Sequence, residues 1–494
     1  IMLEEVCIIG GGVSGIVSSK IAKDHGLVPY VLDKSESWGG VWKDAPNSIG
    51  VWRNLITNTS KYLCSFSDFP WPESTPTYPS NQEVRDYFES YINLHSLASY
   101  FHFNCKVIYV GKQELGYLVR WENLSTREIT EKNFPYVIVG TGLFAKEYLP
   151  FQIPDDFPQG KIVHSARYRD PSHYSGQRVI VIGGSMSACD IAEDLLPHAR
   201  EVIQIVKNPY ILFKRYYNNL PIDFFSMTKS VSNITKNLTH EEKLQLMLGF
   251  YDKVTENSKA CSNLHIDFST IRSPYVAITN NYKDLVEQNR IQIIKSGVSS
   301  VSGQGLALDN GQVIDADTIV LCTGFESDLS FLDAEIQQKI SYSPHDKLIP
   351  VIAFMNTIHP ELPGLAFLGL QRGSLIVKFE MQAEFAIRFF KNLVSLSEES
   401  INTGIRYEIG VRNANPRPQF PYPLLEYLDN LVSLMGFNNA TQDEDLINFR
   451  ENVIYIPQLF RPDRGEAQIS LARQVIAEIK EKFHIENSLY ENLK

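Results

Sequence analysis

A glycine-rich loop near the N-terminus constrains the fold of this chain more than any other feature. The apolar run Glu5–Ile9 enters the turn Gly10-Gly11-Gly12-Val13-Ser14-Gly15, and an apolar-periodic helix follows. A strand, a GxGxxG turn and a helix in this order are typical of a dinucleotide-binding βαβ unit. Gly10 permits the tight turn, Gly12 lets the backbone approach a pyrophosphate, and Gly15 permits close packing of the helix on the strand. The helix N-terminus offers N–H groups and positive potential to the phosphates.

An acidic residue ends the next apolar strand. Asp33 follows Pro29–Leu32 and stands at about the spacing expected for a carboxylate that binds ribose. A glycine turn alone could be only a loop, but the strand, turn, helix and carboxylate together predict a nucleotide site. We expect Lys34, the next residue, to line the same site.

A second segment of the same kind begins at Arg178. Arg178–Ile182 is an apolar strand, Gly183–Ala188 is a turn rich in glycine and serine, and a periodic helix and the strand Val202–Val206 follow. Two βαβ units predict two dinucleotide-binding domains of the α/β class, each with a parallel sheet covered by helices.

Two strands that end in Thr-Gly turns indicate how the chain passes between these domains. Phe134–Gly142 and Asp317–Phe325 are both apolar up to the turn. Paired turns fit two crossings, so we expect the second domain to be inserted into a discontinuous first domain. The expected division is 1–168 for the first part, 169–325 for the inserted domain with a helical excursion near 216–275, and 326–494 for the second part and the C-terminal region. Within the excursion, Thr239–Glu242 resembles a capping box at a helix start.

Composition excludes several classes of protein. The formal net charge of −11 over 494 residues argues against a nucleic-acid binder, although a local basic pocket for one phosphate is compatible with it. No apolar run is long enough to span a bilayer, so no membrane anchor is expected. The six cysteines are scattered without a close pair, which favours free thiols in the cytoplasm. Neither a hydrolytic triad motif nor metal-ligand spacing is present, so we expect no metal.

Three further motifs follow the first loop. They are Trp38–Trp42 (WGGVW), Leu55–Lys61 (LITNTSK) and Phe66–Pro72 (FSDFPWP). Asparagine and threonine in such runs are commonly turn formers. In this order, however, the motifs resemble those of flavin-containing monooxygenases, and the resemblance covers most of the chain.

The resemblance continues in Gly160–Tyr168, which is similar to the family fingerprint FxGxxxHxxx(Y/F). His164 and Tyr168 have the right spacing, but Phe157 stands one position too early. Tyr168 replaces the tryptophan typical of related Baeyer–Villiger monooxygenases, which favours heteroatom oxygenation over ketone oxidation. We expect His164 to be a packed interdomain histidine with no role in proton transfer.

The resemblance implies that the first nucleotide is FAD and that Asn58 is the catalytic residue. The Asn58 amide can donate to a peroxide and accept from a nicotinamide amide, both without a change of charge. The alternative is that Asn58 is only a turn residue. We also expect residues from several other parts of the chain to contact the cofactors. They are Gly40, Val41, Trp42, Thr57, Val107, Thr141, Gly142, Thr323, Gly324 and Gln382.

The second loop departs from GxGxxG and resembles the GxSxSAxD form of bacterial trimethylamine monooxygenases. A serine hydroxyl can still donate to a pyrophosphate, and alanine occupies little space at the packing position. Its candidate residues are Gly183, Ser185, Met186, Ser187, Ala188 and Asp190. After the next strand, Lys207, Lys214 and Arg215 could pair with a 2′-phosphate, which favours NADPH over NADH. The same cations could also form only a solvated loop.

The function implied is that of an NADPH- and O₂-dependent monooxygenase. A C4a-hydroperoxyflavin would transfer one oxygen atom to a soft nitrogen or sulfur of a small-molecule amine or sulfide. Alternatives are a Baeyer–Villiger or halogenating enzyme on the same scaffold, an NADPH-dependent quinone reductase, and a non-enzymatic flavin-binding protein. The resemblance thins between about 216 and 275 and after about 402, where we expect substrate choice to reside. A homodimer is left open.

Overall fold

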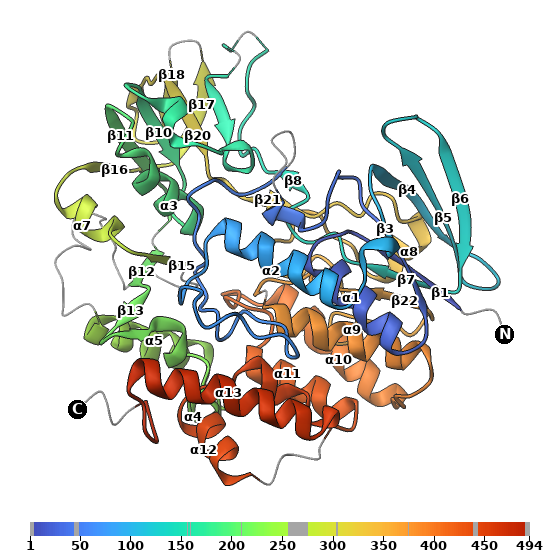
Figure 1. Cartoon of the computed structure of the whole chain (residues 1–494). Helices are drawn as coiled ribbons and strands as arrows, with labels where there is room; N and C mark the ends of the chain where they lie inside the picture. Colours follow the sequence, from blue (N-terminus) through green and yellow to red (C-terminus); the bar gives the residue numbers. More distant parts are fainter. Residues whose placement is uncertain are drawn as a thin grey trace.

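Two parallel sheets and a set of C-terminal helices make up the computed structural model (Figure 1). The structure describes residues 4–43, 49–155, 157–158, 160–208, 210–254, 275–302, 305–373, 375–437 and 443–489. Among these residues, no helix combines the length and the apolar character needed to cross a membrane.

The first sheet contains the N-terminal strand at its centre. Its order is β22-β7-β1-β2-β3, with Ile9 of β1 opposite Leu32 of β2 and Val139 of β7. Burial on both faces explains the continuous apolar runs of these strands. The bounds are β1 Glu5–Ile9, β2 Val28–Leu32, β3 Phe101–His102, β7 Tyr136–Val139 and β22 Leu365–Phe367.

Helices and an antiparallel meander complete this domain. Helix α1 (Val13–Asp24) packs on α9 (Ile376–Phe390), which comes from the far end of the chain. Helix α2 (Asn81–Leu94) begins with a capping box between Ser80 and Glu83. The meander consists of β4 Cys105–Lys112, β5 Tyr117–Asn123 and β6 Ile129–Phe134.

The second sheet has the order β16-β11-β10-β20-β9. In its centre, Ile182 of β10 lies opposite Ile205 of β11 and Leu321 of β20. Helix α3 (Met186–Leu195) covers it after the second glycine loop. The other bounds are β9 Ile162–His164, β10 Arg178–Ile182, β11 Glu201–Val206, β16 Ile291–Lys295, β20 Thr318–Leu321, α7 Tyr282–Glu287, and the hairpin strands β17 Val298–Ser302, β18 Gly305–Leu308 and β19 Val313–Ile314.

The strands of the second sheet fall between β7 and β22 of the first sheet in the sequence. The expected boundary at 168 needs a correction, because β9 (Ile162–His164) already pairs with β20. A three-residue edge strand carries no periodic signal that would reveal this partner. At the crossing, β8 (Lys146–Glu147) pairs with β21 (Phe325–Glu326).

The excursion contains strands as well as helices. Strands β12 (Tyr210–Lys214) and β15 (Tyr275–Thr279) pair in parallel, and β13 (Tyr216–Tyr217) forms a hairpin with β14 (Leu220–Pro221). The capping box is confirmed at α5, because the Glu242 N–H donates to the Thr239 hydroxyl and the Thr239 N–H to the Glu242 carboxylate. The remaining bounds are η5 Ile222–Phe225, α4 Lys229–Thr235 and α5 His240–Val254; 255–274 lie outside the described residues.

The C-terminal helices lie beneath both sheets (Figure 1). Helix α11 packs on α9, and α12 packs on α4 of the excursion. This region therefore bridges the two parts of the molecule. The bounds are α8 Ala334–Lys339, α10 Glu398–Asn413, α11 Leu424–Leu434, α12 Glu444–Asn452 and α13 Glu466–Phe483.

Candidate active site

A large cavity of about 2570 Å³ is lined by residues of both sheets. Both glycine loops line it, and so do Asn58 and the two Thr-Gly turns at Thr141 and Thr323. The cavity therefore brings together segments from every part of the sequence that we expected to bind a nucleotide.

The first glycine loop has the geometry that a pyrophosphate requires. Gly10 has a φ of +111°, and a Cβ there would lie 2.5 Å from the Gly140 carbonyl oxygen. Gly12 faces Gly40, and a Cβ at Gly12 would lie 3.3 Å from the Gly40 Cα. Because Gly12 is also the N-cap of α1 and no side chain caps the helix, the first-turn N–H groups are available to phosphate.

Asp33 stands beside this loop at the cavity. Its Oδ2 accepts from the Gly11 N–H at 2.5 Å and its Oδ1 from the Ser35 N–H at 2.6 Å. Asp33 and the adjacent Lys34 both line the cavity. The carboxylate is thus fixed in orientation at the place where the sequence predicts a ribose.

The second loop repeats this geometry. Gly183 has a φ of +139°, and a Cβ there would lie 2.5 Å from the Cys322 carbonyl oxygen. Ser185 is the N-cap of α3, and its hydroxyl does not cap the helix, so the hydroxyl and the first-turn N–H groups remain available to a ligand. Burial raises the pKa of Asp190 to about 7, while the Arg215 guanidinium acts in the opposite direction.

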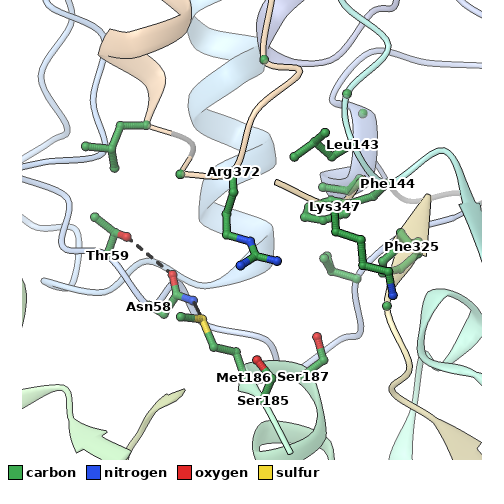
Figure 2. Close-up of a pocket in the computed structure, with 18 of the residues that line it drawn as sticks. Asn58, Thr59, Leu143, Phe144, Ser185, Met186, Ser187, Phe325, Lys347 and Arg372 are labelled. Carbon is green, nitrogen blue, oxygen red and sulfur yellow. Dashed lines mark hydrogen bonds between the residues drawn. The ribbon is translucent and has the colours of Figure 1, made fainter. Parts of the chain in front are cut away.

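Asn58 lines the cavity beside the second loop. Its Nδ2 donates to the sulfur of Met186, and its Oδ1 accepts from the Thr59 hydroxyl at 3.5 Å (Figure 2). The Thr57 hydroxyl donates to the Thr59 carbonyl at 2.9 Å. An uncharged amide therefore lies at the first turn of α3, where the second nucleotide would begin.

Most of the predicted cofactor residues line the cavity. Those that do so are Gly10, Gly12, Val13, Ser14, Asp33, Lys34, Gly40, Val41, Trp42, Thr57, Asn58, Val107, Thr141, Gly142, Gly183, Ser185, Met186, Ser187, Ala188, Asp190, Lys207, Thr323 and Gly324.

Four predicted residues do not line the cavity. Gly15 packs against the loop, where a Cβ would lie 2.0 Å from the Gly10 carbonyl oxygen. The Gln382 amide is buried, accepts from the Gly369 N–H at 3.1 Å and donates to the Thr357 hydroxyl at 3.1 Å. The other two residues are Lys214 and Arg215.

The basic cluster after the second βαβ unit splits into three different environments. Lys207 lines the cavity with an exposed side chain. Lys214 pairs with Asp284 at 3.0 Å, outside the cavity lining. Arg215 is buried and bonded to the backbone of Ile56 and Thr57. The expectation that Lys214 and Arg215 meet a 2′-phosphate is therefore corrected, because both side chains are engaged elsewhere.

His164 is a buried neutral imidazole. Its Nδ1 accepts from the Ala166 N–H at 3.1 Å, so Nε2 carries the hydrogen that bonds the Gly324 carbonyl at 3.0 Å. Burial lowers its pKa. These contacts join β9 to the Thr-Gly turn at the crossing and agree with an interdomain packing role.

Several cations at the cavity were not predicted from the sequence. Arg372 and Lys347 project into it opposite Asn58 (Figure 2). Lys378, in the first turn of α9, is only 3% exposed, and burial lowers its pKa to about 7. A lysine within the apolar run Ile376–Phe379 was the available signal. Among the described residues, no group of three or more His, Cys, Asp or Glu side chains could hold a metal ion.

Two nucleotide loops and an uncharged amide around one cavity define a redox enzyme that works with two dinucleotides. The family model for flavin-binding monooxygenase-like proteins matches residues 3–433. The chain therefore belongs to this family of flavin-containing monooxygenases, whose cofactors are FAD and NADPH. The loop geometry fits both dinucleotides, since the glycine positions leave no room for side chains and the helix starts are uncapped.

Similar proteins agree with this assignment. Dimethylaniline monooxygenase 2 (N-oxide-forming) of Mus musculus is 28% identical over 482 residues, which cover 93% of this chain and 87% of that protein. The structure of S-allyl-L-cysteine S-oxygenase from Allium sativum has a TM-score of 0.64 at 19% identity, covering 98% of this chain and 99% of that one. Tmm from Pelagibacter sp. has a TM-score of 0.62 at 19% identity, covering 90% and 88%.

Proposed function

We propose that this enzyme uses NADPH and O₂ to oxygenate a soft nucleophilic nitrogen or sulfur of a small molecule. The observation that carries the proposal is the position of the Asn58 amide between the two glycine loops, in contact with the first turn of α3. When bound, the flavin would supply the oxygen-transferring group as its C4a-hydroperoxide. The chain itself would bind, orient and shield the reactants.

Different residues would bind the cofactors and orient the reacting groups. The loops at Gly10 and Gly183 would hold the two pyrophosphates through backbone N–H groups. Asn58 would donate through its NH₂ to developing negative charge and accept through its carbonyl from the nicotinamide amide. Neither contact changes the charge of Asn58, so the amide can serve both partners throughout the reaction.

The cavity wall that the excursion forms favours a substrate whose reacting nitrogen or sulfur is uncharged. Phe213, Tyr217, Phe225, Met227 and Phe250 line this part of the cavity, and several of their rings pack together. Apolar walls exclude water, which would otherwise favour side reactions of a reactive intermediate. The similarity to an N-oxide-forming relative and to an S-oxygenase supports nitrogen and sulfur as targets.

Substitution of Asn58 tests the proposal. Asn58→Ala should keep FAD and oxidise NADPH but lose most product, with hydrogen peroxide formed in its place, because the amide that stabilises the developing charge is gone. Product per NADPH consumed is the measurement, with a panel of tertiary amines and sulfides for the wild type. Wild-type coupling in the variant would refute the role of Asn58. Reoxidation of the NADPH-reduced wild type that yields only peroxide with every substrate would refute the oxygenase.

We also propose a cytoplasmic location. The five cysteines among the described residues, Cys7, Cys64, Cys105, Cys189 and Cys322, are free thiols. Free thiols are typical of proteins in a reducing compartment, where disulfides are rare.

A further inference from the structure

Two charged side chains, the buried Arg215 and the half-buried Asp223, hold the backbone on either side of Asn58. Arg215 bonds the residues before it, and Asp223 bonds the residue that follows Thr59. Both come from one short segment of the excursion, which includes the hairpin β13–β14. We propose that Arg215 and Asp223 act as a clamp that positions the Asn58 amide for oxygen transfer. The inference rests on the proposed function and adds two positioning residues to it.

Arg215 forms the first half of the clamp. Its side chain is 3% exposed, Nε donates to the Thr57 carbonyl at 3.0 Å, and Nη2 donates to the Ile56 carbonyl at 3.4 Å. The third guanidinium nitrogen, Nη1, donates to the Asn280 side chain at 3.2 Å. The planar fork thus fixes two successive carbonyls at once, which a lysine ammonium on a flexible stem cannot reproduce.

The backbone of Arg215 is itself fixed. Its carbonyl accepts from the Tyr78 hydroxyl at 2.5 Å and from the Ile222 N–H at 2.9 Å. Its N–H donates to the Thr279 carbonyl at 3.2 Å. The guanidinium is therefore presented from a rigid base, so a contact made by Arg215 constrains the segment that it touches.

Asp223 forms the second half. Its Oδ2 accepts from the Ser60 N–H at 2.6 Å. Burial raises the pKa of Asp223 to about 6, while hydrogen bonds from Ser60 and from the backbone of Asp223 and Phe224 act in the opposite direction. Asp223 thus restrains the chain directly after the Asn58-Thr59 pair.

The Asn58 side chain has little else to orient it. Its amide contacts only the Met186 sulfur and the Thr59 hydroxyl among the described side chains, and both are weak partners at these geometries. Further backbone bonds of this segment lie at its ends, from the Thr57 N–H to Pro79 and from the Lys61 N–H to Thr77. Because misplacement of a reacting group by about 1 Å can cost up to about 10²-fold in rate, the clamp should matter for catalysis.

The clamp also joins Asn58 to the apolar cavity wall. Tyr217 lies in β13, and Ile222 and Phe225 lie in η5 on either side of Asp223; all three line the cavity. The segment that holds the Asn58 backbone is therefore the segment that shapes the wall. A change in that wall would shift Asn58 through Arg215 and Asp223.

A double-mutant cycle tests the clamp. Arg215→Lys and Asp223→Ala, which removes the acceptor of the Ser60 N–H, should each lower product per NADPH by about tenfold. The rate of NADPH-driven flavin reduction should stay near that of the wild type, a split that a general loss of structure would not give. In an Asn58→Ala background neither substitution should lower the product yield further, because residues that act through Asn58 have nothing left to position.

Arg461→Lys is the matched control. Arg461 is equally buried but pairs with Glu380, Glu384 and Asp463 away from the cavity, so coupling should not change. Additive losses in the Asn58→Ala background, or wild-type coupling in Asp223→Ala and Arg215→Lys, would overturn the clamp. If Arg215→Lys fails to fold, Asp223→Ala decides alone. An uncoupled wild type would instead refute the proposed function, so the two failures are distinguishable.

Discussion

The side-chain amide of Asn58 donates to the thioether sulfur of Met186, the first residue of α3. This contact joins a loop of the first nucleotide domain to the helix start of the second. A thioether is a weak acceptor, so a stronger one can replace it at little cost. We therefore expect a bound nucleotide to displace the Met186 sulfur and to offer one of its own oxygens to the Asn58 amide.

Removal of the sulfur tests this reading. Met186→Leu keeps the volume of the side chain but removes the acceptor. We expect product per NADPH to stay within about twofold of the wild type, because the nucleotide supplies the acceptor during turnover. Coupling is measured beside Asn58→Ala, and a Met186→Leu enzyme as uncoupled as Asn58→Ala would show that the sulfur itself is required.

Gly15→Ala should disrupt the FAD site, because the new side chain would push against the first glycine loop. The new Cβ would lie 2.0 Å from the Gly10 carbonyl oxygen, so α1 or the loop must move. Overpacking of this kind costs about 1–3 kcal/mol or more. We expect a lower melting temperature and less flavin absorbance per protein. Gly410→Ala, in open space within α10, is the control and should stabilise the helix by about 1 kcal/mol.

Lys207→Ala should weaken the binding of NADPH but not the binding of NADH. Lys207 lines the cavity, and its ammonium lies 4.0 Å from Asp309, so it can turn toward a 2′-phosphate. Loss of one charged contact predicts a KM for NADPH about tenfold higher, or roughly 1.5 kcal/mol. Steady-state kinetics with both coenzymes provide the measurement. Lys214→Ala, which breaks the pair with Asp284, should change neither KM, and an equal effect of both substitutions would contradict the assignment.

Stability should fall as the pH rises toward about 8 because of Glu408. This carboxyl is fully buried, and burial raises its pKa to about 8, although the N–H groups of Ala353 and Asn356 and the Tyr422 hydroxyl bond it. Between about pH 4.5 and 8 the folded state holds a proton that the unfolded state has lost, so the free energy of unfolding falls with rising pH.

Glu408→Gln isolates this contribution. The amide stays neutral at every pH, so the variant should lose less stability than the wild type between about pH 5 and pH 8. Melting temperatures of both proteins across this range provide the measurement. Parallel pH profiles would show that Glu408 does not hold the proton.

The sequence predicted those parts of the site that depend on local geometry. The positive φ angles at Gly10 and Gly183, the uncapped starts of α1 and α3, and the position of Asp33 follow from short motifs. Each of these features is set within one turn or between neighbouring strands. These features can therefore be predicted without knowledge of the rest of the fold.

Contacts between residues far apart in the sequence could not be predicted from local patterns. Arg215 looked like a phosphate ligand because it follows a βαβ unit, but its guanidinium lies against carbonyls of residues more than 150 positions earlier. Strand β9 gave no sign of its partner β20. Lys378 stood out as a lysine within an apolar run, but that pattern does not show that it faces the cavity. In each case the tertiary partner, and not the local pattern, decides what the residue does.

The order of strands in the first sheet has a consequence for biosynthesis. Strand β22 (Leu365–Phe367) pairs with β7 (Tyr136–Val139), yet the whole second sheet is encoded between them. Domains generally fold as units while the ribosome adds residues from the N-terminus. The second sheet, whose last strand ends at Leu321, can close on the ribosome before the first one can. The N-terminal strands must therefore wait, with an open sheet edge at β7, until residue 367 has emerged from the exit tunnel.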